Sequence, residues 1–213
     1  MNNTIRLLWG MLLAGLFMIL SAQAENEPAN TTSNQGLAVA TFSGGCFWCT
    51  ESDFEKIDGV VKVISGFTGG KLKNPTYEQV SSGTTQHLES VEVYFDPKRV
   101  SYKKLLDAVW KMINPTDDGG QFVDRGHQYT TAIFYHNETQ KKLAEASRKA
   151  LDTSGRYDKP IVTPIRKALP FYPAEAYHQD YYKRNPIRYH FDRWKSGRDQ
   201  YLEKIWGADA LHG

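Results

Sequence analysis

The pattern of apolar and polar positions predicts that strands and helices are interspersed along the chain. Strict alternation over Leu88–Phe95 predicts a two-faced strand that stops at Asp96-Pro97. Apolar residues at helical spacing after Ser101 predict an amphipathic helix that this serine can cap. Further strands are expected at Leu37–Ser43, Val60–Gly66, Thr130–Tyr135 and Ile161–Leu169, and further helices at Cys46–Ile57, Asn74–Val80, Asn137–Asp152 and Ala174–Lys183.

This order of elements determines the expected fold class. Interspersed strands and helices, together with a strand that has one apolar face, favour a mixed or antiparallel sheet with helices packed on it. We therefore predict an α+β two-layer sandwich of the ferredoxin-like plait type. Residues from Pro186 onward are aromatic and basic without a clean period, and we expect a long irregular tail there.

The N-terminal residues have the pattern of a secretory signal peptide. Arg6 gives a basic start, Leu7–Leu20 is apolar but shorter than a spanning helix, and Ala22-Gln23-Ala24 resembles a cleavage site. An uncleaved membrane anchor is the alternative. We expect an exported protein, periplasmic or secreted, without a stable membrane anchor. Its parts are a signal peptide (1–24), a flexible leader (25–36), one catalytic domain (37–190) and a C-terminal tail (191–213).

The formal charge excludes one class of partner. Lys and Arg number 26 and Asp and Glu number 24, and the net charge of +2 gives no electrostatic footprint for nucleic acid. Aromatic residues make up 13% of the chain, which is enough to line a pocket as well as a core.

Cys46 and Cys49 are the two cysteines of the chain, and they lie where a predicted strand gives way to a predicted helix. A thiol at a helix N-terminus meets free N–H groups and the positive end of the helix dipole, which favour the thiolate. Residues i and i+3 share a helix face, so the pair can form a disulfide. A redox-active pair is favoured over a structural bridge, because so short a loop barely constrains the unfolded chain. It is also favoured over a zinc half-site, because the histidines lack paired spacing; we expect no metal.

Glu89 lies on the apolar face of the predicted strand, with Val91 and Val93. A carboxyl group there would lose hydration and keep its proton near neutral pH, so that it could donate that proton in a reaction. A strand-end glutamate that reaches water explains the pattern equally well.

Aromatic residues follow the first cysteine. Phe47 and Trp48 could form a dry pocket that suits a thioether, although core packing is as good an explanation for Phe47. Histidines at positions 87, 127 and 178 could assist acid–base chemistry, with plain hydrogen bonding as the favoured role.

Five segments in one order resemble the A-type peptide methionine sulfoxide reductases, and the resemblance extends from about Leu37 to about Pro186. They are Gly45-Cys46-Phe47-Trp48, Asn74-Pro75-Thr76-Tyr77-Glu78-Gln79-Val80, His87-Leu88-Glu89, Asp124-Arg125-Gly126-His127-Gln128-Tyr129 and Phe171-Tyr172-Pro173-Ala174-Glu175-Ala176-Tyr177-His178-Gln179. The resemblance implies a two-layer α/β fold. It also implies reduction of the S epimer of methionine sulfoxide, free or in peptides and proteins.

The resemblance also implies a role for each candidate residue. Cys46 would be the nucleophile and Glu89 the proton donor to the sulfoxide oxygen. The substrate methyl group would contact Phe47 and Trp48, and the oxygen, or the water that replaces it, would be bound by Tyr77, Asp124 and Tyr129.

Many family members keep recycling cysteines in a C-terminal tail, which has none here, so Cys49 would resolve a sulfenic acid on Cys46 as a disulfide. A thioredoxin-like donor would reopen that disulfide. No metal or organic cofactor is required, and we expect a monomer.

Two other functions remain open at this point. A thioredoxin-type thiol–disulfide oxidoreductase also places a C-x-x-C motif at a helix start, but the bulky Phe-Trp interior suits a small-molecule pocket better. A non-enzymatic binding domain held by one disulfide would have two inert thiols.

Overall fold

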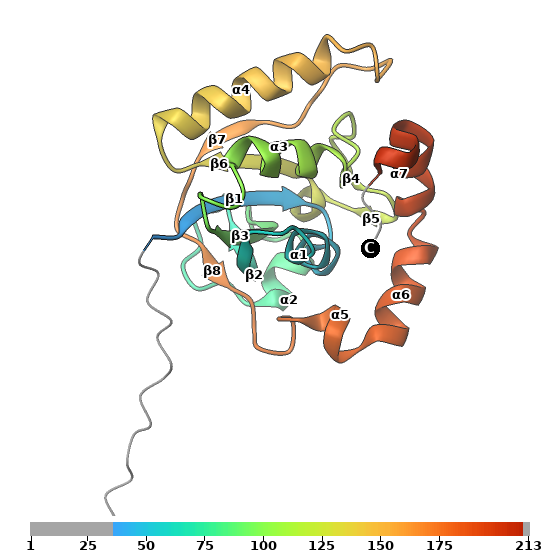
Figure 1. Cartoon of the computed structure of the whole chain (residues 1–213). Coiled ribbons are helices and arrows are strands. Elements are labelled where there is room, and N and C mark those ends of the chain that lie inside the picture. The colour runs from blue at the N-terminus through green and yellow to red at the C-terminus, as the bar shows by residue number, and fades with distance from the viewer. Residues whose placement is uncertain (1–35, 211–213) are drawn as a thin grey trace, which may run out of the picture. The chain divides into compact units, whose positions relative to one another are not determined.

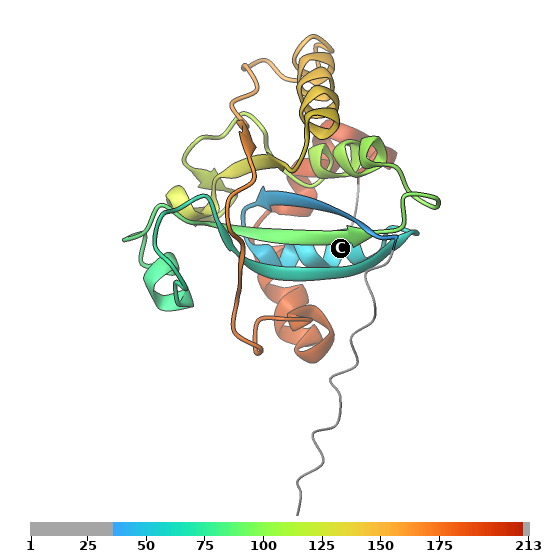
Figure 2. The same ribbon diagram turned by 90° about the vertical axis from the view of Figure 1, so that its left-hand side faces the viewer.

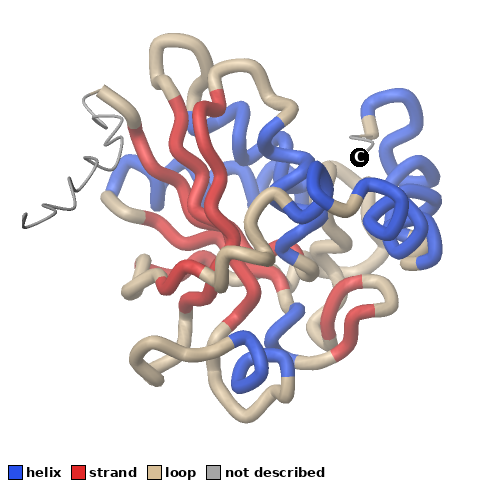
Figure 3. Tube along the Cα trace, turned by 90° about the horizontal axis from the view of Figure 1, so that it is seen from below, coloured by secondary structure: helices blue, strands red, loops and turns tan. Residues whose placement is uncertain are grey.

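The computed structural model describes residues 36–210, so the predicted signal peptide and nearly all of the leader lie outside the described residues. The described part is built on a sheet with the strand order β7-β6-β1-β3-β2-β8 (Figure 1). The strands are β1 (Ala38–Gly44), β2 (Val60–Thr68), β3 (Leu88–Phe95), β6 (Thr131–Tyr135), β7 (Ile165–Lys167) and β8 (Tyr172–Pro173). Figure 3 shows these strands (red) running side by side.

The connections between the central strands give the fold class. Helix α1 (Phe47–Glu55) joins β1 to β2, and α3 (Tyr102–Trp110) lies between β3 and β6. β1, β2, β3 and β6 pair antiparallel, whereas β6 and β7 pair parallel. The order β6-β1-β3-β2 with two helical crossovers is that of a ferredoxin-like plait. The prediction of an α+β fold with a mixed sheet and helices packed on it is confirmed.

The core lies between the sheet and these helices. β1 and β3 each turn alternate side chains toward α1 and α3, and Phe42, Val91 and Val93 are fully buried there. The ring of Phe42 stacks on Phe54 of α1 at a centroid distance of 5.0 Å. Burial of such side chains contributes roughly 1.5–3 kcal/mol each, so α1 is fixed firmly over the sheet.

Two of the predicted helix N-termini are confirmed, those at Ser101 and Asn137. Ser101 accepts a hydrogen bond from Lys104 N at the start of α3, and Asn137 caps α4 (Glu138–Asp152), which packs on α3 (Figure 2). The start expected at Asn74-Pro75 is wrong. Helix α2 (Tyr77–Ser81) is capped by Thr76, and Asn74 instead has a φ of 49° that belongs to a turn.

The segment after α4 is less regular than predicted. The strand expected at Ile161–Leu169 is reduced to β7, and the helix expected at Ala174–Lys183 is reduced to α5 (Tyr181–Arg184). Between β7 and β8 the chain crosses the sheet from one edge to the other (Figure 2, orange). Thr68 Oγ1 donates to the carbonyl oxygen of Pro170 at 3.0 Å, which holds this crossing against the sheet.

The tail that we expected to be irregular is helical up to residue 209. It forms α6 (Pro186–Lys195), α7 (Arg198–Trp206) and a 3₁₀ turn (Gly207–Asp209). The predicted boundary between residues 190 and 191 falls inside α6. Tyr189, Arg193, Arg198 and Leu202 are buried, so tertiary contacts make these helices part of the domain. Within residues 36–210 no helix has the length and apolar character needed to cross a membrane.

Candidate active site

Cys46 occupies the N-cap position of α1, directly after the end of β1. The turn requires Gly45, which has a φ of +83° and no room for a side chain: a Cβ there would lie 2.6 Å from Gln121 Cβ. Cys46 is partly exposed, and Cys49, one turn further along, is 6% exposed. Both thiols are free, and Cys49 is the neighbour with the largest effect on the pKa of Cys46. The two cysteines therefore share one face of the helix, as the spacing predicted.

Glu89 is buried beside this helix start, which resolves the two explanations left open by the sequence. The pairing of Phe42 with Val91 brings the beginning of β3 next to the end of β1. Glu89 is 2% exposed, and its Oε2 accepts a hydrogen bond from Phe47 N at 3.0 Å. Burial raises the pKa of Glu89 to about 8 against the effect of that N–H group. The carboxyl group consequently holds its proton at neutral pH.

The surroundings of Cys46 in the substrate-free protein disfavour the thiolate that the sequence predicted. The hydrogen bond with Cys49, then burial, and then the neighbouring Glu89 and Asp124 raise the pKa of Cys46 well above its ordinary value. The sequence argument relied on a free N–H at the helix start, but Phe47 N already donates to Glu89. Cys46 is therefore a thiol that can donate its S–H.

Cys49 is the more acidic sulfur. The hydrogen bond from Cys46 lowers the pKa of Cys49 to about 7 against burial, and the charges of Arg198 and Arg193 lower it further. Both arginines come from the C-terminal helices α7 and α6. The surroundings therefore favour the thiolate of Cys49 over that of Cys46.

Aromatic side chains form one wall of the site. Phe47 is 1% exposed and packs against the rings of Phe67 and Tyr77, at centroid distances of 5.8 and 6.3 Å. Trp48 is half-buried, stacks on Tyr181 at 3.8 Å, and donates from Nε1 to His178 Nδ1 at 3.2 Å. His178 thus has the hydrogen-bonding role favoured for it. Tyr181 was missed, because stacking across separate segments leaves no mark in the sequence pattern.

Three further predicted residues lie close enough to Glu89 for their charges to act on one another: Tyr77, Asp124 and Tyr129. They come from α2, from the two-stranded ribbon of β4 (Gly120–Gln121) and β5 (Asp124–Arg125), and from the 3₁₀ turn His127–Tyr129. Burial, followed by the charge of Glu89, raises the pKa of Tyr77 to about 12 and also raises the pKa of Tyr129. Burial raises the pKa of Asp124 as well. Both phenol groups stay protonated and can donate hydrogen bonds to an oxygen atom held near Glu89.

A cavity of about 360 Å³ opens beside the cysteines. Its lining combines the start of α1 with α6 and the turn between β4 and β5, and comprises Cys46, Trp48, Cys49, Val123, Asp124, Tyr189, Asp192, Arg193, Lys195 and Ser196. A larger cavity of about 620 Å³ lies between α3, α4 and Trp206, and neither cysteine nor Glu89 lines it. The smaller cavity therefore gives access to Cys46, Trp48, Cys49 and Asp124, whereas Glu89, Phe47, Tyr77 and Tyr129 are not part of its lining.

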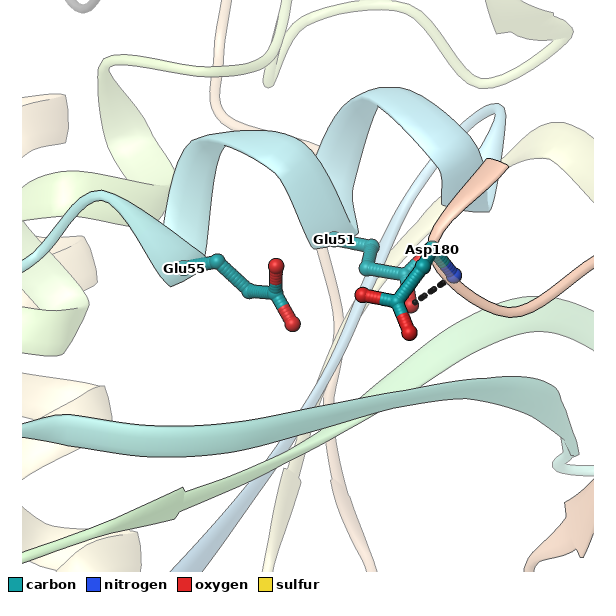
Figure 4. Close-up of side chains that lie close together, drawn as sticks. All are labelled: Glu51, Glu55 and Asp180. Atoms are coloured by element: carbon teal, nitrogen blue, oxygen red, sulfur yellow. Dashed lines mark hydrogen bonds between the residues drawn. The ribbon is translucent and has the colours of Figure 1, made fainter. Parts of the chain in front are cut away.

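Three carboxylates lie close together, with ligand atoms within 4.8 Å of one another: Glu51, Glu55 and Asp180 (Figure 4). Asp180 N donates to Glu51 Oε1 at 3.0 Å, the contact drawn in the figure. Lys183 Nζ lies 2.6 Å from Glu55 and from Asp180, and supplies a positive charge to both. The cluster ties the segment that carries His178 and Tyr181 to α1.

A pair of reduced thiols, a carboxyl group that keeps its proton and an aromatic wall together define a thiol-dependent oxidoreductase. The chain belongs to the peptide methionine sulfoxide reductase family, whose model matches residues 38–210. It is a peptide-methionine (S)-S-oxide reductase, and the alternative of a thioredoxin-type oxidoreductase is not favoured.

Similar proteins agree with this membership. The peptide methionine sulfoxide reductase MsrA of Bacillus licheniformis is 56% identical over 79% of this chain and 93% of its own length. The MsrA/MsrB protein of Vibrio cholerae is 51% identical over 94% of this chain, which spans 54% of that longer relative. Among solved structures, reduced Mxr1 of Saccharomyces cerevisiae is 29% identical with a TM-score of 0.66, over 71% of this chain and 87% of that one. Methionine sulfoxide reductase A of Corynebacterium diphtheriae is 30% identical with a TM-score of 0.61, over 71% of this chain and 76% of that one.

Proposed function

We propose that the protein reduces methionine (S)-sulfoxide, free or in proteins, with Cys46 as nucleophile, Glu89 as acid and Cys49 as resolving thiol. One observation carries the proposal: the protonated carboxyl group of Glu89 is held against the start of α1 by Phe47 N, next to the Cys46 thiol. A sulfoxide oxygen is a poor leaving group until it is protonated, so a neutral acid beside a sulfur nucleophile is the arrangement that the reaction needs.

In the first step, the Cys46 sulfur attacks the sulfoxide sulfur while Glu89 gives its proton to the oxygen. The proton of the Cys46 S–H group replaces it on Glu89, so a preformed thiolate is not required. The sum of the step is sulfoxide plus thiol giving methionine plus a Cys46 sulfenic acid. Phe47 and Trp48 contact the methyl group, and Tyr77 and Tyr129 donate hydrogen bonds to the oxygen, or to the water that replaces it, beside Asp124.

In the second step, the Cys49 thiolate attacks the sulfenic sulfur of Cys46. An S–S bond forms, the S–O bond breaks, and the leaving hydroxide takes the proton of Glu89 to become water. Glu89 is left as a carboxylate and regains one proton from solvent, which balances the proton that Cys49 released on forming its thiolate. Cys49 sulfur is oxidised and Cys46 sulfur is reduced. A thioredoxin-like dithiol protein then reduces the disulfide and restores both thiols.

The experiment for the activity is turnover with the separate S and R epimers of a blocked methionine sulfoxide and a dithiol reductant. We expect methionine from the S epimer only, with insulin reduction at background. Equal turnover of both epimers, or insulin reduction in place of sulfoxide reduction, would overturn the proposal.

Replacing Cys49 by serine is predicted to stop the cycle after one turnover. Cys49→Ser should still form about one equivalent of methionine, because the first step needs only Cys46 and Glu89. The sulfenic acid should then persist and be labelled by dimedone, as mass spectrometry of the Cys46 peptide would detect. If this variant cycles normally with a dithiol protein, the donor itself resolves Cys46 and our role for Cys49 is wrong.

We also propose that the protein is exported to the periplasm or secreted after signal peptide cleavage, and that it acts there as a monomer. The basic start, the apolar run and the Ala-Gln-Ala segment support export. The reductant would then have to be an exported thioredoxin-like protein. Fractionation of cells, with mass spectrometry of the mature N-terminus, tests the proposal.

A further inference from the structure

Arg198 is the largest fully buried side chain of the protein's described part, with 1% of its surface exposed. It begins α7, and its guanidinium lies under the turn that leads into Cys46. Nη1 donates to Met112 O at 2.6 Å and Nη2 donates to Gly44 O at 3.1 Å. A Cβ on Gly45 would lie 3.2 Å from Nη2. The C-terminal helix thus brings a positive charge to the base of the cysteine turn.

Within the described residues, the guanidinium of Arg198 forms no ion pair with a carboxylate, in contrast to that of the neighbouring Arg193. Arg193 is equally buried and is bound by Asp53 at 2.8 Å and by Asp199 at 2.8 Å. Within residues 36–210, Arg198 has no carboxylate within ion-pair distance and its Nε has no hydrogen-bond partner; the ring of Phe122 covers it at 4.6 Å. An arginine stays charged in proteins, and two carbonyl oxygens and the ring of Phe122 offset only part of the cost of burying that charge. The site consequently favours an anion nearby.

Cys49 can supply that anion. It lies one turn into α1 and is buried, and the charge of Arg198 is the strongest of the ionic effects that lower its pKa. We propose that Arg198 is a positioning residue whose buried guanidinium stabilises the thiolate form of Cys49 and thereby speeds its attack on the Cys46 sulfenic acid. This inference rests on the proposed function, since it concerns the second step of the same reaction.

Other groups also face Cys49, and the experiment must separate their effects. They are Asp53 from α1, Cys46 and Lys56 from its two caps, Glu89 from β3, Asp124 from β5, Tyr189 and Arg193 from α6, and Arg198 from α7. The test variants change Arg198 alone, so the other side chains around Cys49 are the same in every test variant.

The test compares Arg198→Met, which removes the charge, with Arg198→Lys, which keeps it. Reduced protein is mixed with one equivalent of the S-epimer sulfoxide, and methionine, dimedone-reactive Cys46 and disulfide are measured over time from pH 6 to 9. We expect Arg198→Met to form methionine at a rate within about threefold of the unchanged protein, because Cys46 and Glu89 are intact. Disulfide formation at pH 7 should be slower by about fivefold, the effect of raising the pKa of Cys49 by about one unit, and should recover at pH 9.

Arg198→Lys should keep the pH profile of the unchanged protein, which a loss of packing alone would not explain. Arg99→Met serves as the matched control, because Arg99 is exposed and pairs with Asp58, and neither residue lines the cavity beside the cysteines. If Arg198→Met does not fold, Arg198→Gln replaces it, since the amide group can still donate to a backbone carbonyl without a charge. An unchanged rate and pH profile of disulfide formation in a folded, uncharged variant would overturn the inference. Absence of sulfenic acid and disulfide in the unchanged protein would instead overturn the proposed function.

Discussion

Serine in place of Cys46 is expected to leave the protein folded and without measurable reduction of methionine sulfoxide. The hydroxyl group is a far weaker nucleophile than sulfur, and it can form neither the sulfenic acid nor the disulfide. The expected loss is therefore complete, and it should appear in a single-turnover assay as well as in steady state. Methionine released from a blocked S-epimer substrate, measured by chromatography, provides the readout.

The result also distinguishes the two sulfurs. Cys49 is the more acidic of them, so acidity alone would select it as the nucleophile. Accessibility to substrate instead favours Cys46 as the nucleophile, because Cys46 is partly exposed beside Glu89 whereas Cys49 is only 6% exposed. Cys49→Ser is the matched control, with one turnover retained. Should Cys46→Ser retain that single turnover and Cys49→Ser lose it, the roles of the two cysteines would be reversed.

The positions of Glu89 and the two cysteines could be predicted, because strand alternation and helix spacing are visible in the local sequence. Alternation over Leu88–Phe95 matches β3 at both ends and assigns Glu89 to the buried face. The i, i+3 spacing of Cys46 and Cys49 is set by helix geometry alone. The placement of Tyr77, Asp124 and Tyr129 around them came from the resemblance of whole segments, since each residue alone resembles an ordinary surface or hydrogen-bonded position.

Features that depend on tertiary contacts could not be predicted in this way. The helices α6 and α7 lack a clean apolar stripe, because one buried face of this region carries Arg193 and Arg198 rather than aliphatic side chains. The pKa order of the two cysteines depends on those arginines and on the donation of Phe47 N to Glu89. Local sequence rules describe a helix start with free N–H groups, and they give no indication that a distant carboxyl group occupies one of them.

Glutamine in place of Glu89 is expected to slow the first step by roughly 10²–10⁴-fold at neutral pH, the usual contribution of a positioned general acid. The amide oxygen can still accept from Phe47 N, but glutamine has no proton to transfer. In the unchanged protein the same rate should fall about tenfold per pH unit above pH 8, as Glu89, whose pKa is about 8, loses its proton. Glu89→Gln should lack this alkaline decline. Single-turnover formation of methionine from pH 6 to 10 measures both effects.

Glu89→Gln is expected to slow the reaction but to raise the stability of the protein. This contrast distinguishes the loss of a general acid from a loss of the folded structure. The pKa of Glu89 is raised from 4.5 to about 8, so between these values the native state binds a proton that the unfolded state has lost. Stability of the unchanged protein therefore falls as pH rises through this window, by at most about 5 kcal/mol for this group. Glu89→Gln should be progressively more stable than the unchanged protein in urea unfolding from pH 5 to pH 9.

Glu92→Gln is the control, because Glu92 is half-buried on the opposite face of β3, and it should change neither the rate nor the pH trend. A normal first-step rate in Glu89→Gln would remove Glu89 as the acid, and the protonated Tyr77 and Tyr129 would be the groups left to donate to the oxygen.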